Sequence, residues 1–264
     1  MPALQTIITN PDGLAELAQR LAGAAVVALD TEFLRESTYR AQLCLLQITD
    51  AGDPVCVDPL AIEDLTALAP ALGSTSSLKV MHAPRQDIEV LLPAVGMVQP
   101  LFDTQVAAAL AGMPAQIGYA ELVRRLLGVE LSKAHTRTDW SHRPLAAEQI
   151  AYALDDVRYL PTLAERLDAE LERLGRRRWL DEELAALADP RTYSVEPGRA
   201  WLRVKGLQGL DPARSRLARE LAAWRERRAI ERNRPRGWIL DDATLRELVL
   251  APPRTPVELA AIPG

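Results

Sequence analysis

Two carboxylates stand two residues apart at the end of an apolar run, in the sequence Val27-Ala28-Leu29-Asp30-Thr31-Glu32-Phe33. Residues i and i+2 of a strand project from the same face, so Asp30 and Glu32 lie side by side if this run is a strand. Two like charges at that separation repel each other unless cations bridge them, and carboxylate oxygens are ligands for hard divalent cations. The pair therefore indicates a metal site, although acids at strand ends also commonly cap the turn that follows.

A third acid and a tyrosine–acid pair follow later in the chain. The run Val80-Met81-His82 has strand character, and Asp87 falls in the first turn of the helix expected after it. The helix dipole favours an acid at that place, so Asp87 alone has a purely structural explanation. Tyr152 and Asp156 are four residues apart and share one face of a helix. Asp155 is three residues from Tyr152, so spacing alone leaves Asp155 and Asp156 as alternatives.

Taken in this order, the motifs resemble ribonuclease D, of the tyrosine-bearing branch of the DEDD exonuclease superfamily. That superfamily has Asp-x-Glu in its first motif, Asp in its second and Tyr-x-x-x-Asp in its third, and the last spacing selects Asp156 over Asp155. Other similar segments are Leu29–Phe33, Tyr39, Gln42–Gln47, His82-Ala83, Asp103–Gln105 and Arg137–Trp140. The similarity covers residues 4–188, while residues 210–264 resemble the start of a helicase-and-RNase-D C-terminal (HRDC) domain.

The resemblance implies a 3′→5′ exoribonuclease that hydrolyses phosphodiester bonds with two divalent metal ions, Mg²⁺ or Mn²⁺, and releases nucleoside 5′-monophosphates. Asp30, Glu32, Asp87 and Asp156 would hold the metal ions. Tyr152 would orient the attacking water, because a phenol with a pKa near 10 is a poor base at neutral pH. The implied partner is RNA with a free 3′ end, with tRNA precursors as the family substrate. The alternatives are a DNA exonuclease of the same superfamily and a non-catalytic nucleic-acid-binding module.

Five further residues are candidates for binding the substrate. Phe33 follows the acidic pair and could stack against a terminal base, but it could equally be a core residue. Lys133 and Arg137 lie in a polar stretch that could contact backbone phosphates. Gln42 and His82 belong to segments that resemble the family. A zinc site is not expected, because acids supply the ligands and the chain has only three histidines.

The acidic motifs require a sheet that brings distant segments together. Apolar, β-rich runs predict strands over residues 24–33, 42–49 and 54–57, which we interpret as an antiparallel meander. From residue 79 the pattern is strand, helix, strand, with a connection long enough for parallel pairing. The fold class expected is α/β, a ribonuclease H-like mixed sheet flanked by helices, followed by a small all-α domain of HRDC type.

Capping residues and prolines predict where helices begin and end. Asn10 and Pro11 suit the N-cap and first position of a helix, and Pro161 should kink or split the amphipathic stretch that begins near Ala146. Glycines suited to left-handed caps follow two of the expected helices. The other helices are predicted over residues 62–72, 86–92, 115–127, 212–232 and 241–250, with a break at 235–237.

Length and charge favour two domains. Residues 1–202 contain 18 Lys/Arg against 28 Asp/Glu, whereas residues 203–236 contain eleven against four, a net charge of +7. An acidic body followed by a basic segment suits a catalytic domain joined to a module that contacts phosphate, although an Arg-rich solvated helix has the same charge. We expect a catalytic domain over residues 1–200 and an HRDC-type domain over residues 201–264. The chain stops at a turn, Ala261-Ile262-Pro263-Gly264, so this second domain is expected to be truncated.

Composition excludes several classes of protein. No apolar run approaches the roughly 20 residues needed to cross a bilayer, and the first residues lack the features of a secretory signal. The two cysteines, Cys44 and Cys56, are too few for a disulfide framework and are expected to be buried thiols. We therefore expect a cytoplasmic monomer with no membrane partner.

Overall fold

The protein is described by a computed structural model of residues 6–132 and 138–262. Contacts within the chain divide it into two compact units. The first consists of Met1–Leu34 and Leu43–Thr192, and the second of Arg35–Gln42 and Tyr193–Gly264. The segment between the second and third strands therefore belongs, by its contacts, with the C-terminal helices.

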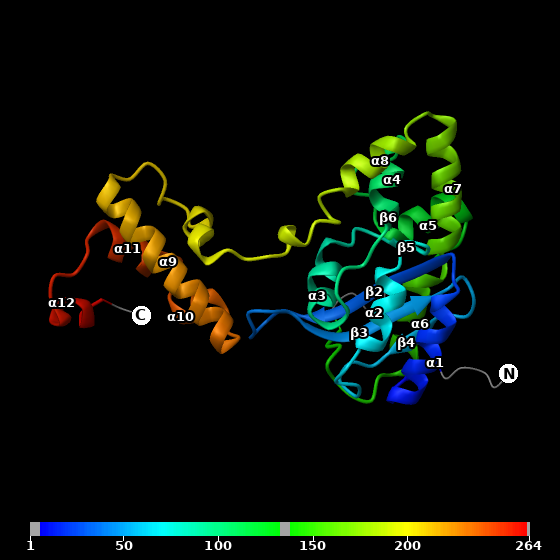
Figure 1. Cartoon of the computed structure of the whole chain (residues 1–264), viewed down its shortest axis with the longest axis horizontal. Coiled ribbons are helices and arrows are strands. Elements are labelled where there is room, and N and C mark those ends of the chain that lie inside the picture. Colours follow the sequence, from blue (N-terminus) through cyan, green and yellow to red (C-terminus); the bar gives the residue numbers. More distant parts are fainter. Residues whose placement is uncertain (1–5, 133–137, 263–264) are drawn as a thin grey trace. The chain divides into compact units, whose positions relative to one another are not determined.

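The first unit is built on a six-stranded mixed sheet with the order β1-β4-β3-β2-β5-β6 (Figure 1). Strand β2, which contains the acidic pair, has β3 and β5 as neighbours and so lies inside the sheet. Strands β3 and β4 are antiparallel, while β1–β4, β2–β5 and β5–β6 are parallel. The parallel β5–β6 pair is the one that the pattern from residue 79 predicts. The strands are β1 (Ile7–Ile8), β2 (Val26–Leu34), β3 (Gln42–Thr49), β4 (Val55–Val57), β5 (Leu78–Met81) and β6 (Leu101–Asp103).

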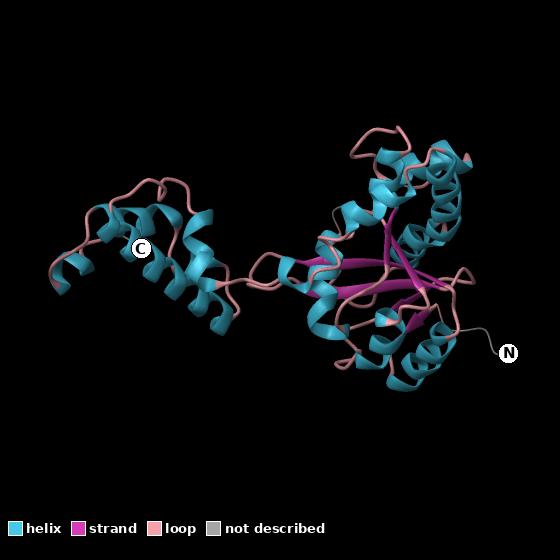
Figure 2. Ribbon diagram, turned by 45° about the horizontal axis from the view of Figure 1, so that its top comes forward, coloured by secondary structure: helices cyan, strands magenta, loops and turns pink. Residues whose placement is uncertain are grey.

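Helices surround this sheet, as Figure 2 shows. One face of the sheet, through Ala28, Val80 and Phe102, packs into a core with residues of α4, α5, α7 and α8. Because side chains alternate along a strand, Asp30 and Glu32 project from the same face of the sheet as Ala28. The helices of this unit are α1 (Pro11–Ala22), α2 (Ala69–Gly73), α3 (Arg85–Val95), α4 (Thr104–Leu110), α5 (Tyr119–Leu127), α6 (Ala147–Arg158), α7 (Leu160–Arg173) and α8 (Arg177–Leu184), with 3₁₀ turns η1 (Thr66–Leu68) and η2 (Pro190–Thr192).

Most local signals act as expected. The Asn10 side chain accepts a hydrogen bond from Gly13 N at 2.9 Å and caps α1. Helix α5 ends at Gly128, which has a left-handed φ of 71°. The stretch from residue 146 is divided into α6 and α7, with Pro161 in the first turn of α7. The described residues of the chain include no helix long and apolar enough to span a membrane.

The helix predicted over residues 62–72 is wrong in its first half. The side chain of Asp64 accepts a hydrogen bond from Thr66 N at 2.8 Å, and this local turn takes the place of the first helical turn. Helical structure begins only at Thr66, as a 3₁₀ turn, and α2 follows. Gly73 is the last residue of α2, and the cap is Ser74 in extended conformation rather than a left-handed glycine.

The second unit is helical, and its longest helix matches the prediction. Helix α9 begins at Pro212, after Asp211 has capped it, and ends at Arg232, with Asn233 in the left-handed conformation. The hydrophobic core of the second unit comprises Ala200, Val204, Leu207, Ala218, Ala222, Leu245 and Val249. A short helix at residues 236–239 was not predicted, because Pro235 and Gly237 indicate a break. The helices are η3 (Pro197–Arg203), α9 (Pro212–Arg232), α10 (Arg236–Ile239), α11 (Asp242–Leu250) and α12 (Pro256–Ala260).

Candidate active site

Strand β2 presents the first two acids. Val27, Ala28 and Leu29 are fully buried, which fixes the strand in the middle of the sheet. Asp30 and Glu32 follow at its far end and, as alternating residues, project to the same side. The sequence prediction that these two carboxylates lie together is therefore met by the backbone.

Helix α6 brings the third acid to the same place. Its buried residues Ala153, Leu154 and Val157 hold it against the rest of the unit. Carboxylate oxygens of Asp30, Glu32 and Asp156 all lie within 4.8 Å of one another. The Tyr152 hydroxyl, one helical turn before Asp156, donates a hydrogen bond to the Asp156 carboxylate.

Asp155, the alternative to Asp156, has a different environment. Its carboxylate forms an ion pair with Arg158, with Arg158 Nε 2.9 Å from Asp155 Oδ1, and both side chains are about 40% exposed. It is not one of the three acids whose oxygens approach one another among the described residues. The geometry therefore favours Asp156.

Asp87 lies beside this cluster but not in the same close group of described residues. It occupies the first turn of α3 and is 8% exposed. Its Oδ1 accepts a hydrogen bond from Thr31 Oγ1 at 2.5 Å, and Thr31 stands between the two acids of β2. Asp87 is near enough for its charge to raise the pKa of Asp30 and of Glu32.

The electrostatics of the cluster are those of like charges removed from water. Burial raises the pKa of Glu32 to about 8, with Asp156 and Asp87 adding to the shift. Burial and the charge of Asp155 raise the pKa of Asp156 to about 7, against the opposing effect of the Tyr152 hydrogen bond. The pKa of Asp30 is raised well above its usual range by burial and by the surrounding carboxylates.

These residues fit a hard divalent cation. No arginine or lysine in the described part of the chain forms an ion pair with Asp30, Glu32 or Asp156, so their negative charge has no cationic side chain opposite it. Oxygen-only ligands in a partly buried acidic cluster suit Mg²⁺ or Mn²⁺ better than zinc, which prefers nitrogen and sulfur. Burial and neighbouring charges also raise the pKa of Tyr152, so its hydroxyl keeps its proton near neutral pH.

The predicted substrate-binding residues have varied surroundings. Phe33 is partly exposed in β2 next to Glu32, and Gln42 is exposed at the first position of β3. His82 already has protein partners for both ring nitrogens, with Nδ1 2.9 Å from Thr104 Oγ1 and Nε2 3.0 Å from Ile117 O. Lys133 and Arg137 lie outside the described residues.

The basic segment of the second unit is only partly available for binding. Trp224 and Trp238 are exposed. Arg225, in contrast, is 3% exposed, and its Nη1 donates to Leu240 O and to Asp242 Oδ1. Arg225 is therefore a structural residue of this unit.

Sequence reasoning missed three residues that support the site. Thr31 donates to Asp87. Tyr119 on α5 donates to Asp155 O at 2.9 Å and packs edge-on against His82. Asp103 accepts from Ala83 N at 3.0 Å, at the turn that leads into α3. Strand alternation predicts that Thr31 projects away from the face of Asp30 and Glu32, so it gives no reason to expect Thr31 at the site. No local signal indicates the long-range partners of Tyr119 or Asp103 either.

A mixed sheet with carboxylates on an interior strand, joined by a tyrosine and an aspartate on a helix, fits the DEDD class of metal-dependent 3′→5′ exonucleases. The 3′–5′ exonuclease family matches residues 5–172, and the HRDC domain family matches residues 214–264. The chain belongs to the ribonuclease D family, and its enzyme class is 3′→5′ exoribonuclease.

Individual relatives illustrate this membership. Ribonuclease D of Zymomonas mobilis is 44% identical over 264 residues, covering 99% of this chain and 67% of the relative. The crystal structure of Escherichia coli RNase D, described as an exoribonuclease involved in structured RNA processing, superposes with a TM-score of 0.92 at 35% identity, covering 97% of this chain and 68% of that one. Brucella melitensis NrnC with bound Mg²⁺ gives a TM-score of 0.59 at 28% identity, covering 78% and 94%. The chain spans about two thirds of the length of its ribonuclease D relatives.

Proposed function

We propose that this chain shortens RNA from its 3′ end by two-metal-ion hydrolysis and releases nucleoside 5′-monophosphates. The observation that supports this proposal most directly is the approach of Asp30, Glu32 and Asp156 oxygens within 4.8 Å of one another, with Tyr152 bonded to Asp156. When bound, two divalent cations would stabilise the attacking and leaving oxygens of the displacement. Asp30, Glu32 and Asp156 would hold them, and Asp87 would complete the set from α3.

Tyr152 would orient the attacking water rather than deprotonate it. Its raised pKa keeps the phenol protonated, so the hydroxyl can donate to one oxygen and accept from a water at the same time. The proton of the water would pass to solvent or to a carboxylate whose pKa lies near neutrality.

We propose precursors of tRNA as the substrate and the cytoplasm as the place of action. Escherichia coli RNase D is described as acting on structured RNA, and it is similar to this chain over 97% of the chain's length. The HRDC-type unit and its basic segment would contact the RNA backbone, and Phe33 would stack on the terminal base. We also propose that the protein acts as a monomer, with the catalytic domain extending to about residue 200.

The test is degradation of labelled single-stranded RNA and of DNA of the same sequence, with Mn²⁺, Mg²⁺ or EDTA. We expect stepwise loss of 3′ nucleotides from RNA, abolished by EDTA. Asp156→Asn should lower kcat by about 100-fold or more, because a metal ligand is lost. Asp155→Asn is the matched control and should leave the rate within about twofold, since its partner Arg158 is on the surface.

Three results would contradict the proposal. If Asp155→Asn abolished activity and Asp156→Asn did not, the ligand assignment would be wrong. Faster degradation of DNA than of RNA under matched conditions would assign the activity to a DNA exonuclease. Binding of RNA without cleavage at any metal concentration would leave only a binding module.

A further inference from the structure

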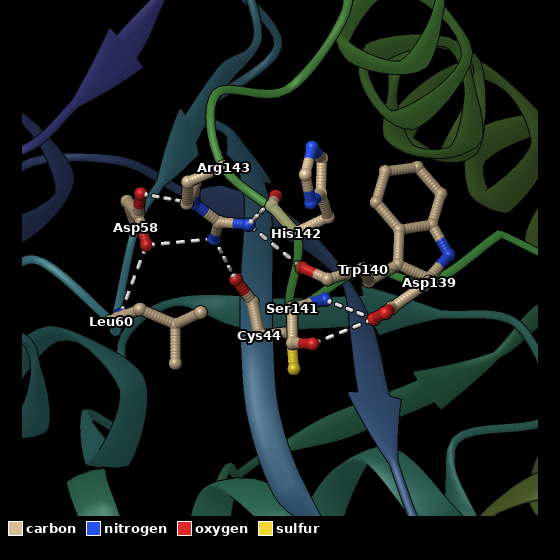
Figure 3. A network of polar contacts seen from close by, with 8 residues as sticks. All are labelled: Cys44, Asp58, Leu60, Asp139, Trp140, Ser141, His142 and Arg143. Carbon is tan, nitrogen blue, oxygen red and sulfur yellow. Dashed lines mark hydrogen bonds and ion pairs between the residues drawn. The ribbon is translucent and has the colours of Figure 1, made fainter.

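Arg143 lies in the segment between residue 138 and α6, and every N–H group of its guanidinium has an acceptor (Figure 3). Nε donates to Asp58 Oδ2 at 2.7 Å, and Nη2 donates to Asp58 Oδ1 at 2.8 Å and to Cys44 O at 2.7 Å. Nη1 donates to Trp140 O at 2.7 Å and to His142 O at 2.9 Å. A guanidinium has five N–H donors, so none remains for a phosphate.

Asp58 is a rigid anchor for this arginine. It follows directly on β4, its side chain is 5% exposed, and its backbone N–H donates to Ile8 O at 2.9 Å. Its Oδ1 also accepts from Leu60 N at 2.9 Å. Hydrogen bonds from Arg143 and from the backbone hold the pKa of Asp58 below its usual range against the effect of burial. Arg143 is therefore tied to the ends of β3 and β4.

Trp140 links this anchor to the active site. Its carbonyl is held by Arg143, its side chain is 4% exposed, and it packs with Cys44, Ala153 and Leu154. Its ring stacks on the ring of Tyr152, with centroids 6.2 Å apart and planes at 29°. Tyr152 in turn donates to Asp156, so a continuous chain of contacts leads from Asp58 to the acidic cluster.

We propose that Arg143 is a positioning residue for Tyr152, acting through Trp140, in the reaction of the proposed function. A tyrosine on a helix can rotate about two side-chain torsions, and the stacked indole limits that freedom. A hydroxyl that orients water must be placed closely, and small misplacements of reacting groups cost up to about 100-fold in rate. Every guanidinium N–H of Arg143 already has an acceptor within the protein, so none is left to bind RNA. Arg143 therefore affects the placement of Tyr152 and not the affinity for RNA.

The test is a double-mutant cycle on the full chain between Arg143→Lys and Tyr152→Phe. Lysine keeps the charge but loses the planar fork that bonds Asp58 twice. We expect Arg143→Lys to lower kcat on single-stranded RNA by about 10-fold, with KM and the affinity for Mn²⁺ alone unchanged within about twofold. In the Tyr152→Phe background, the same change should have no further effect on kcat.

Two further variants keep the test decisive. Asp58→Asn leaves an acceptor for Leu60 N but weakens the arginine pair, and it should reproduce the kcat effect even if Arg143→Lys does not fold. Arg158→Gln is the matched control, because it breaks an exposed arginine–aspartate pair on α6 and should leave kcat unchanged.

The outcomes separate the possible failures. If the loss from Arg143→Lys multiplies with that from Tyr152→Phe, or appears in KM, then Arg143 acts on general stability or on RNA binding and the inference is wrong. If Tyr152→Phe is as fast as the unchanged chain, or the unchanged chain does not degrade RNA, the proposed function fails first and the inference falls with it.

Discussion

At the scale of single residues, the active-site carboxylates are held in an environment that opposes their charge. Glu32 and Asp156 would be fully ionised in water at pH 7, yet burial moves their pKa values to about 8 and about 7. The metal-free site therefore keeps protons that the unfolded chain would release. A cation that binds there replaces those protons, so metal affinity must rise with pH over the same range.

The first prediction is a pH dependence of stability in EDTA. Unfolded carboxyls titrate near pH 4 and the folded ones near 7–8, so the folded state binds more protons between these values and stability falls as pH rises from about 5 to about 8.5. Asp30→Asn removes one of the repelling charges. It should reduce this fall and raise Tm at pH 8.5 by about 2–6 °C.

Thermal unfolding at several pH values checks this prediction. Asp181→Asn serves as the control and should keep the slope of the unchanged chain, since its side chain is 67% exposed and pairs with Arg177 rather than with the cluster. Saturating Mn²⁺ at pH 8.5 should raise the Tm of the unchanged chain and not that of Asp30→Asn. If stability fell equally with rising pH in all three proteins, repulsion among the carboxylates of the cluster would not be the cause of the fall.

At the scale of elements, junctions between strands and helices position the site. Asp103 ends β6 and caps α4, with Oδ1 2.8 Å from Gln105 N and 3.4 Å from Val106 N. The same oxygen accepts from Ala83 N at 3.0 Å, and Ala83 has a left-handed φ of 54°, a conformation that costs energy for any residue other than glycine. Asp103 therefore holds the strained turn from which α3 and Asp87 begin.

The second prediction concerns this junction. Asp103→Ala removes a cap and leaves Ala83 N without its acceptor at a partly buried position, so it should lower the free energy of unfolding of the first unit by about 2 kcal/mol. Asn10→Ala removes the cap of α1, which has one backbone bond and no second role, and should cost about 1 kcal/mol. Urea unfolding followed by circular dichroism gives both values, and equal losses would refute a special role for the bond to Ala83.

At the scale of the whole molecule, the chain passes between its two units more than once. The segment Arg35–Gln42 leaves β2 just after the acidic pair, belongs by its contacts to the helical unit, and returns to β3. Within that unit the Tyr39 hydroxyl donates a short hydrogen bond to Oε1 of Glu226, which is fully buried in α9. Arg40 N donates to the Asn233 side chain at 3.2 Å. The HRDC-type unit is therefore completed by residues that the catalytic part supplies.

The third prediction follows from the burial of Glu226. Among the described residues its other oxygen has only Arg236 Nη1, at 3.7 Å, so Tyr39→Phe leaves a buried carboxylate short of donors. Amide exchange in α9 should accelerate by about 10-fold or more, corresponding to a loss of about 1.4 kcal/mol. Thr38→Ala is the control, because the Thr38 hydroxyl donates to Arg40 O, a local bond two residues along the chain, and its loss should leave exchange in α9 unchanged. Unchanged exchange in Tyr39→Phe would show that the bond is dispensable.

Local patterns in the sequence determined much of what is found here. Alternation along β2 places Asp30 and Glu32 on one face, helical spacing places Tyr152 one turn from Asp156, and capping residues mark the ends of α1, α5 and α9. Strand alternation, helical spacing and capping each depend on residues a few positions apart, so the sequence alone predicts them. The same locality explains the wrong start of the helix near residue 62, where a single side chain–backbone bond outweighs helical propensity.

Only the tertiary structure decided the features that join distant segments. Asp155 and Asp156 are distinguished geometrically by which of them faces β2, and Asp87 is engaged by Thr31, 56 residues away. The link from Asp58 through Arg143 to Trp140, and the attachment of Tyr39 to Glu226, have no counterpart in spacing along the chain. Such contacts depend on how the sheet and helices pack in three dimensions, and no local periodicity encodes that packing.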